Sequence, residues 1–216
     1  MSTLFKSFLT GTLLTVGLVV AGAGLASAAK MTGTLTADNH YSLYTGIKNG
    51  SKLNFVGRNE VGLNGSKGRY NWSHAETWTF NINSGDYIYN VVWDDAAVAE
   101  SWIGEFKLPD GKTLLSKAKD WEYVIAKGKN PGDYGAVPAL QELKSEIANA
   151  HWIRAKEIGL NGINPWGKIK EVSANASFLN VSNQKSSHYT IFRTKYAAYK
   201  SVPEPTATPK KRRRKG

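Results

Sequence analysis

The chain has no cysteine in its 216 residues. No disulfide can form, and enzymes that depend on a thiol are excluded. A folded domain of this length must therefore be stabilised by the burial of apolar side chains. Apolar residues make up 41% of the chain and include seven Trp, which argues for a folded core and against disorder.

Catalytic motifs are also lacking. The nucleophile-elbow pattern G-x-S-x-G does not occur, and the four histidines show no H-x-x-x-H spacing for zinc. A Ser/His/Asp set could still assemble from distant positions, but no residue stands out as its nucleophile. We therefore predict a protein that is not an enzyme.

Acidic residues are few, with 17 Asp and Glu against 28 Lys and Arg, and the formal charge is +11. Much of this excess lies at the two ends of the chain. Lys6 lies in a segment that we expect to be removed, and residues 201–216 hold six Lys or Arg and one Glu. The modest remaining surplus is spread among many acidic residues, which is typical of a solvated surface and not of a nucleic-acid groove.

The first 28 residues have the organisation of a secretory signal peptide. Lys6 precedes an apolar run from Phe8 to Leu25, and Ala26-Ser27-Ala28 supplies small residues where signal peptidase cleaves. The alternative is an uncleaved anchor, because the apolar run nearly reaches membrane-spanning length. Glycines within the run and the A-x-A site favour cleavage after Ala28. We predict an exported protein in the periplasm, at the cell surface or secreted.

From Lys30 to about Val124 apolar and polar side chains alternate with a period close to two. "ETWTFNIN" places Trp78, Phe80 and Ile82 on one face, and "HYSLYTG" alternates similarly, which is typical of half-buried strands. "DYIYNVVWD" is apolar on both faces and indicates a central strand. Turn signals such as Asn64-Gly65 separate these runs. The pattern predicts a mainly β fold for residues 29–200, an antiparallel β-sandwich of jelly-roll type.

One stretch has helical spacing instead. "PALQELKSEIANAHWIRAKEIG" carries apolar residues from Leu140 to Ile153 at helical intervals, with Pro138 at its start and Gly159 as a cap. We predict a single amphipathic helix around 138–158 that covers an open end or flank of the sandwich. The later runs "KIKEVSANASFLNV" and "HYTIFRTKYAAY" return to strand-like patterns.

Two acidic pairs come at the ends of predicted strands. They are Asp38-Asn39 and Asp94-Asp95. If these strand ends meet, their oxygens could bind Ca²⁺, which takes six to eight oxygen ligands. The alternative is that they cap strands and turns, where Asp and Asn are common. A structural calcium ion is the only cofactor that the sequence suggests.

Aromatic residues supply the candidate ligand contacts. Trp72 lies in the loop "GRYNWSH", Tyr134 in "NPGDYG" and Trp166 in "NPWG". Exposed aromatic faces pack against apolar faces of ligands, so we predict these three as binding residues; the alternative for each is a place in the core. The tryptophans at inward positions are predicted core residues: Trp78, Trp93, Trp102 and Trp121.

The chain ends "SVPEPTATPKKRRRKG". The triplet Pro203-Glu204-Pro205 and the terminal basic cluster resemble the PEP-CTERM sorting signal of exported Gram-negative proteins, which implies handling by an exosortase-type system. In that family a hydrophobic stretch separates the two parts, whereas here only Thr206 to Pro209 does, far short of the ~20 residues that span a bilayer. We expect 201–216 to be a disordered tail and the mature protein to be released, with no stable membrane span. The cluster is Lys210, Lys211, Arg212, Arg213, Arg214 and Lys215.

The body of the chain carries a second resemblance. "ADNHYSLY" and "GDYIYNVVWDD" are similar to galactose-binding-like sandwich modules, over roughly residues 32–182. We therefore expect an exported, non-enzymatic cell-envelope or extracellular-matrix protein that binds exopolysaccharide or an envelope glycan. One alternative is a structural surface protein without a soluble ligand. Another is non-specific binding of polyanions by the tail, which salt would weaken.

Overall fold

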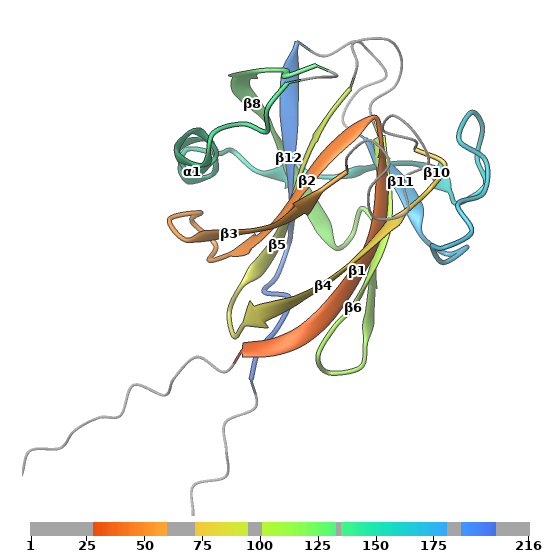
Figure 1. Cartoon of the computed structure of the whole chain (residues 1–216), viewed down its shortest axis with the longest axis horizontal. Coiled ribbons are helices and arrows are strands. Elements are labelled where there is room, and N and C mark those ends of the chain that lie inside the picture. Colours follow the sequence, from red (N-terminus) through yellow and green to blue (C-terminus); the bar gives the residue numbers. More distant parts are fainter. Residues whose placement is uncertain (1–27, 60–71, 95–100, 133–134, 181–186, 202–216) are drawn as a thin grey trace, which may run out of the picture.

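The structure is a computed structural model that describes residues 28–59, 72–94, 101–132, 135–180 and 187–201. Within these ranges the chain forms two antiparallel sheets that pack face to face, together with one short helix (Figure 1). The prediction of a mainly β, antiparallel sandwich is confirmed.

The first sheet, called sheet A, is built around the longest strand. Its hydrogen-bonded order is β10 (Lys156–Leu160), β11 (Ser177–Asn180), β6 (Ser101–Lys107), β1 (Ala28–Asp38) and β4 (Glu76–Asn83), and β7 (Thr113–Leu115) pairs with β6. The run "ETWTFNIN" forms β4 as predicted, with Thr77, Thr79 and Asn81 exposed on its outer face.

The second sheet, called sheet B, contains the central strand that the sequence indicated. Its order is β3 (Leu53–Arg58), β2 (His40–Gly46), β5 (Tyr87–Trp93), β12 (His188–Thr194), β8 (Trp121–Lys129) and β9 (Ile153–Arg154). Strand β5 is buried on both faces except at Tyr87. Such burial requires a covering layer on each side of the sheet.

Aromatic side chains fill the space between the sheets. Trp102 meets Trp121 edge to face with 4.7 Å between ring centroids, and it meets Phe192 in the same way at 5.6 Å. Aromatic pairs favour this geometry because the positive ring edge faces the negative ring face. Trp102 and Trp121 are fully buried in this core, as predicted, and Trp78 is partly buried against it. Trp93 is also fully buried, as predicted, but in the cluster on the other face of sheet B.

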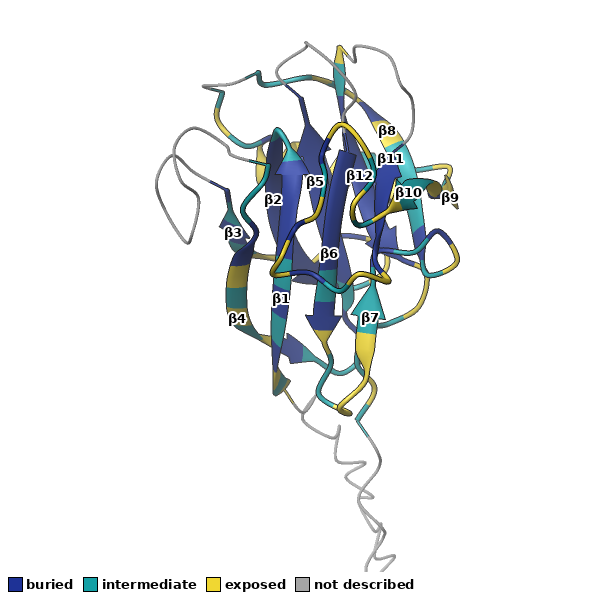
Figure 2. Ribbon diagram, turned by 90° about the vertical axis from the view of Figure 1, so that its right-hand side faces the viewer, coloured by how far each residue is buried: buried dark blue, intermediate teal, exposed yellow. Residues whose placement is uncertain are grey.

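Further layers cover the outer faces of both sheets. Helix α1 (Leu140–Ala148) packs Leu143 and Ile147 on the outer face of sheet B, in a cluster with Tyr89, Tyr189 and Ile191. The connection between β10 and β11 lies on the other side of the molecule, against sheet A (Figures 1 and 2). The cluster under α1 includes Tyr44 of β2, and β2 is buried along its whole length, although its alternation predicted a half-buried strand.

The predicted helix over 138–158 is too long. Helix α1 ends at Ala148, where the Asn149 amide nitrogen Nδ2 donates a 2.8 Å hydrogen bond to the Ser145 carbonyl. Residues 153–160 then form β9 and β10, which pair with β8 and β11. Backbone hydrogen bonds to β8 and β11 therefore replace those that a longer helix would make within itself, and tertiary pairing outweighs the local helical spacing. The later run at 168–181 is also shorter as a strand than predicted, because β11 begins only at Ser177.

A buried arginine holds three of these segments together. Arg193 in β12 is 4% exposed, and its Nη2 forms an ion pair with Glu122 of β8. Its Nη1 donates to the Lys48 carbonyl at 2.6 Å, and its guanidinium carbon lies 3.9 Å from the centroid of the Trp152 ring. Strand β8, the turn between β2 and β3, and the segment after α1 therefore meet at one side chain.

Both ends of the described chain lie at the same end of the sandwich (Figure 1). Ala28, at the start of β1, pairs with Asn83 at the end of β4. At the C-terminal end, the Ser201 N–H donates to Ser84 Oγ at 3.0 Å and the Gly85 N–H donates to the Tyr199 carbonyl at 2.8 Å. The turn between β4 and β5 thus lies next to both ends.

The packing of α1 predicts unequal effects for two leucines of the same helix. Replacement of the fully buried Leu143 by Ala should lower the free energy of unfolding by about 2–5 kcal/mol, because it leaves a cavity under the helix. Leu140→Ala is the matched control; Leu140 is 44% exposed, so the change should be within about 0.5 kcal/mol. Urea unfolding followed by fluorescence measures both, and equal losses would contradict the packing of α1.

Candidate functional site

The structure brings the described residues of the two predicted acidic pairs, Asp38, Asn39 and Asp94, to one end of the sandwich. The register of β2 and β5 pairs His40 with Trp93, which places Asn39 next to Asp94. The strand ends therefore meet, as the calcium hypothesis requires. Asp95 lies outside the described residues.

Protein donors engage both described carboxylates. Asp38 Oδ2 accepts a 2.7 Å hydrogen bond from the Trp166 indole, and Asp94 Oδ1 accepts one of 2.9 Å from Asn130 Nδ2. At these two oxygens, calcium would compete with the protein donors. Across the described ranges, no three His, Asp or Glu side chains gather as a metal site requires.

The candidate aromatic residues have different positions. Trp166 is 4% exposed and stacks on Phe178 at 4.7 Å between centroids, so the prediction of an exposed ligand contact at Trp166 is wrong. Its ring completes the apolar layer that covers sheet A, which explains its burial. Trp72 is half-buried against the same layer, and its role in ligand binding stays a prediction. Tyr134 lies outside the described residues.

A polar pocket opens on the flank of the sandwich near β7 and β10. Its volume is about 430 Å³, which is in the range of small-ligand sites. Cations, carboxylates, an amide and a hydroxyl line it together with one leucine. The lining residues are Thr113, Leu115, Lys117, Lys119, Asp120, Arg154, Glu157 and Asn175.

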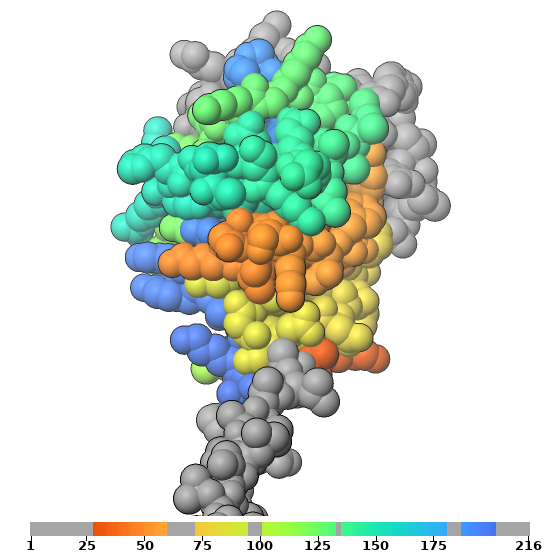
Figure 3. Space-filling model, turned by 90° about the vertical axis from the view of Figure 1, so that its left-hand side faces the viewer, coloured from red at the N-terminus to blue at the C-terminus, as the bar shows by residue number. Residues whose placement is uncertain are grey.

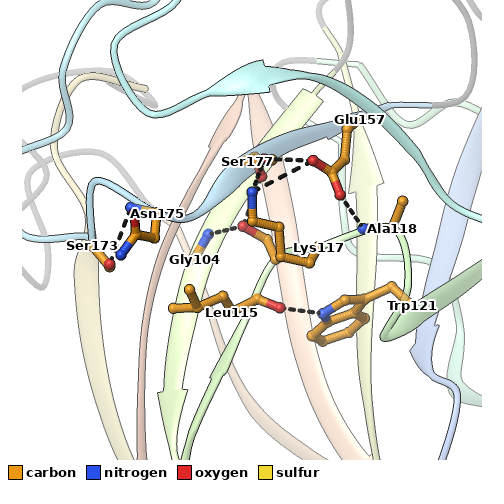
Figure 4. A network of polar contacts seen from close by, with 10 residues as sticks. Gly104, Leu115, Lys117, Ala118, Trp121, Glu157, Ser173, Asn175 and Ser177 are labelled. Carbon is orange, nitrogen blue, oxygen red and sulfur yellow. Dashed lines mark hydrogen bonds and ion pairs between the residues drawn. The ribbon is translucent and has the colours of Figure 1, made fainter.

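One wall of the pocket is a hydrogen-bonded chain of three side chains (Figure 4). Lys117 Nζ donates to Ser177 Oγ at 2.7 Å, and Ser177 Oγ donates to Glu157 Oε2 at 2.8 Å. The other Glu157 oxygen accepts from the Ala118 N–H at 2.8 Å. These bonds join β11, β10 and the segment between β7 and β8.

Buried polar contacts support this wall from below. Ser116 Oγ donates to the Ser177 carbonyl at 2.7 Å and accepts from the Gly104 N–H at 3.1 Å. The Trp121 indole donates to the Leu115 carbonyl at 3.0 Å. The segment 115–118 is thereby fixed to sheet A and to the aromatic core, so the pocket is formed before any ligand arrives.

The environment of Glu157 favours its charged form. Partial burial by itself would raise the pKa of Glu157. The hydrogen bonds from Ala118 and Ser177 and the nearby Lys117 ammonium outweigh that effect, so the pKa lies below its ordinary value of 4.5. Glu157 is therefore a fixed negative acceptor at neutral pH.

The Ser177–Lys117 pair has the composition of a catalytic Ser–Lys dyad but not its geometry. Ser177 is fully buried, so an incoming substrate cannot reach its Oγ. Its proton is directed to Glu157, and Lys117 donates to the same oxygen where a general base would have to accept. The arrangement positions charges and does not generate a nucleophile.

The rim of the pocket presents side chains to solvent. Arg154 and Lys119 are exposed, and the Arg154 guanidinium is held in place because Nε donates to the Ala118 carbonyl at 3.2 Å. The lining contains three cationic side chains and two carboxylates. The pocket therefore offers donors and acceptors together, with a slight excess of positive charge.

Sequence reasoning missed this pocket because Arg154 and Glu157 fell within the predicted helix. A competing signal was present: Ile153 and Ala155 alternate with Arg154 and Lys156, which favours a strand. The alternation is only a few residues long and overlaps the helical spacing. The partners of Glu157 are 39 and 20 positions away in the chain, beyond any local pattern.

Among the residues that the structure describes, no helix has the length and apolar character needed to cross a bilayer.

The shifted pKa of Glu157 predicts an acid-dependent loss of stability. The pKa of Glu157 is lower in the folded protein than in the unfolded chain. Its carboxylate therefore adds to the free energy of unfolding above pH 4.5, and this stabilisation is lost as the pH falls through the folded pKa. Over a third of the side chain is exposed, so the contribution should be below about 1 kcal/mol. Unfolding free energies of the natural chain and Glu157→Gln should differ at pH 7, and the difference should shrink as the pH falls below 4.5 and through the lowered pKa. A difference that is constant with pH would contradict this assignment.

Comparison of the chain with protein-family models, with curated proteins and with solved structures found no match. A β-sandwich hosts many unrelated functions, so the fold does not select one. What the protein does has to be inferred from the chemistry of its surface.

Proposed function

We propose that this chain is an exported, non-enzymatic protein of the cell envelope or extracellular matrix that binds carbohydrate, exopolysaccharide included. The pocket lined by Arg154, Lys119, Glu157 and Asn175 is its binding site. The burial of Ser177 supports a role in binding over a role in catalysis.

The observation that carries the proposal is the mixture of fixed donors and acceptors in a pocket of sugar size. Each sugar hydroxyl both donates and accepts hydrogen bonds, so a complementary site needs both kinds of partner. Here Glu157 and Asp120 accept, while Arg154 and Lys119 donate. Binding to a preformed site also loses less conformational entropy than binding to one that must first be ordered.

The excess of cations in the pocket favours a sugar that carries a carboxylate. A uronic acid residue would place its charge near Arg154, whose planar guanidinium suits carboxylates. Acidic exopolysaccharides contain such residues. The slight positive charge of the pocket then serves recognition, while Leu115 provides a small apolar contact.

The start of β1 is compatible with export. Cleavage after Ala28 would remove one residue from the eleven-residue strand and leave its pairing with β4 and β6 almost complete. The PEP triplet and the basic cluster lie outside the described residues. We infer that an exosortase-type system handles this tail and that the protein is released without a stable membrane span, since only four residues separate the two parts.

The test is titration calorimetry of the purified chain with sodium alginate, a polyuronate, and with dextran, a neutral glucan. Arg154→Gln should weaken alginate binding about tenfold or more, because a hydrogen bond to a charged group contributes about 1.5–3 kcal/mol. The matched control is Lys112→Gln, which removes one positive charge from an exposed side chain outside the pocket.

Two outcomes would contradict the proposal. In the first, the natural chain binds neither polysaccharide. In the second, Arg154→Gln and Lys112→Gln have the same small effect, which would indicate non-specific attraction. A chain with the six cations of 210–215 replaced by Gln measures how much binding the tail contributes. If those replacements alone abolish binding, the pocket is not the site.

A further inference from the structure

A second polar depression lies on the opposite side of the molecule from the pocket. It consists of two adjoining hollows of about 450 and 710 Å³, which share Ser51 and Lys144 in their linings. Together they form a groove between α1, the turn joining β2 and β3, and the turn joining β4 and β5. Figure 3 shows these three segments one below another on this face. The groove and the pocket have no lining residue in common.

The first wall of the groove is the turn between β2 and β3, which is fixed from below. The Tyr89 hydroxyl donates to the carbonyls of Ile47 and Lys48 at 2.8 and 3.0 Å, and Arg193 donates to the latter as well. Burial raises the pKa of Tyr89 to about 12, so this hydroxyl keeps its proton at neutral pH. The turn is therefore anchored to sheet B by two buried donors.

The second wall is α1, and it is fixed just as firmly. Leu143 and Ile147 are buried under it, and Glu142 accepts a 2.8 Å hydrogen bond from the Tyr189 hydroxyl. Behind the lining residues, α1 and the turn pack against each other at Gly50, where a Cβ would lie 2.6 Å from Ile147 Cγ2. Gly50 also has a φ of +72°, which glycine adopts without strain. Helix and turn therefore form one rigid edge.

The lining of the groove is rich in groups that suit sugar hydroxyls. Side-chain amides both donate and accept hydrogen bonds, and five of them line the two hollows: Asn49, Asn54, Asn83, Gln141 and Asn149. Lys144 lies where the hollows join, and Lys52 adds a second cation. Asp86 is the carboxylate in the lining, and it is buried and accepts a hydrogen bond from the Asn83 side chain. The charges that the groove presents to a ligand are therefore those of its two lysines, within an otherwise neutral polar surface.

The shape and place of the groove indicate an extended ligand. Two joined hollows exceed the size of one sugar residue and suit several residues of a chain. Helix α1, which lines the groove, and β10, which lines the pocket, lie on opposite sides of the molecule (Figure 1). A polysaccharide segment in the groove and another in the pocket would therefore not compete.

We propose that the groove is a second glycan-binding site, for a short stretch of an acidic polysaccharide chain, so that one domain holds two chain segments at once. This inference rests on the proposed carbohydrate-binding function. A bivalent domain cross-links long chains, since the second segment binds at the high effective concentration that the first one creates. The protein would thus connect matrix polysaccharide and not merely coat it.

The experiment separates the two sites with a short and a long form of one probe. At a hexamer concentration that just saturates the natural chain, calorimetry should give two hexamers bound per natural chain. The number should fall toward one for Lys144→Gln, Ser51→Trp or Arg154→Gln, because a loss of affinity of about tenfold or more leaves the altered site largely empty. With long alginate at a matched concentration, the natural chain should increase light scattering at least several-fold through cross-linking, and each of these variants should strongly reduce that increase while still binding the hexamer.

Two control chains and three possible outcomes decide the question. Lys127→Gln removes an exposed cation outside both sites and should behave as the natural chain does. If the groove variants also bind two hexamers, the groove proposal is overturned. If the natural chain binds only one hexamer, and Arg154→Gln removes it while the groove variants do not, the groove proposal fails and the proposed function stands. A further variant has the six cations of 210–215 replaced by Gln. If this variant binds one hexamer instead of two, the tail and not the groove is the second site.

Discussion

The guanidinium of Arg193 is buried on the outer face of sheet B, where it contacts three segments that are far apart in the sequence. It pairs with Glu122, donates to the Lys48 carbonyl and stacks on Trp152. A buried charge is tolerated only when it is paired and its donors are satisfied. The turn before β3 and the segment after α1 must therefore stay in place around it. That turn is one side of the groove and that segment follows α1, which is the other, so Arg193 helps to set the shape of the groove together with Tyr89 and the buried face of α1.

The pocket and the groove are built on the same physical plan. In each, a solvent-exposed rim of polar side chains stands on backbone that buried hydrogen bonds hold in place. Ser116 and Ser177 fix the segment beside Glu157, while Tyr89 and Arg193 fix the turn beside Ser51. Both sites are thus formed without a ligand, which lowers the entropy lost on binding. The apolar layers over both sheets make this possible, because they let polar side chains be buried with their partners.

Local patterns predicted the strands well where burial differs between the two faces. Trp78, Phe80 and Ile82 point inward, and Trp102 and Trp121 lie between the sheets, where bulky apolar side chains at alternate positions are buried. Trp93 is also buried, but in the cluster on the outer face of sheet B that includes Leu143 of α1. Local patterns failed at Ile153–Leu160, where helical and strand spacing overlap. There the pairing with β8 and β11 decided the outcome. Trp166 was misplaced for a related reason: its burial results from Phe178 and Asp38, which no neighbouring residue reveals.

The sequence by itself determined the absence of disulfides, the alternating strands and therefore the β-sandwich. Each of these follows from composition or from the two-residue period, which the chain carries locally. Only the tertiary structure decided that Asp38 meets Trp166, that Lys117, Ser177 and Glu157 form one wall, and that α1 and the β2–β3 turn enclose a groove. These contacts join residues up to 128 positions apart. They depend on strand order and register, which are set by the packing of the whole core and not by any short stretch of residues.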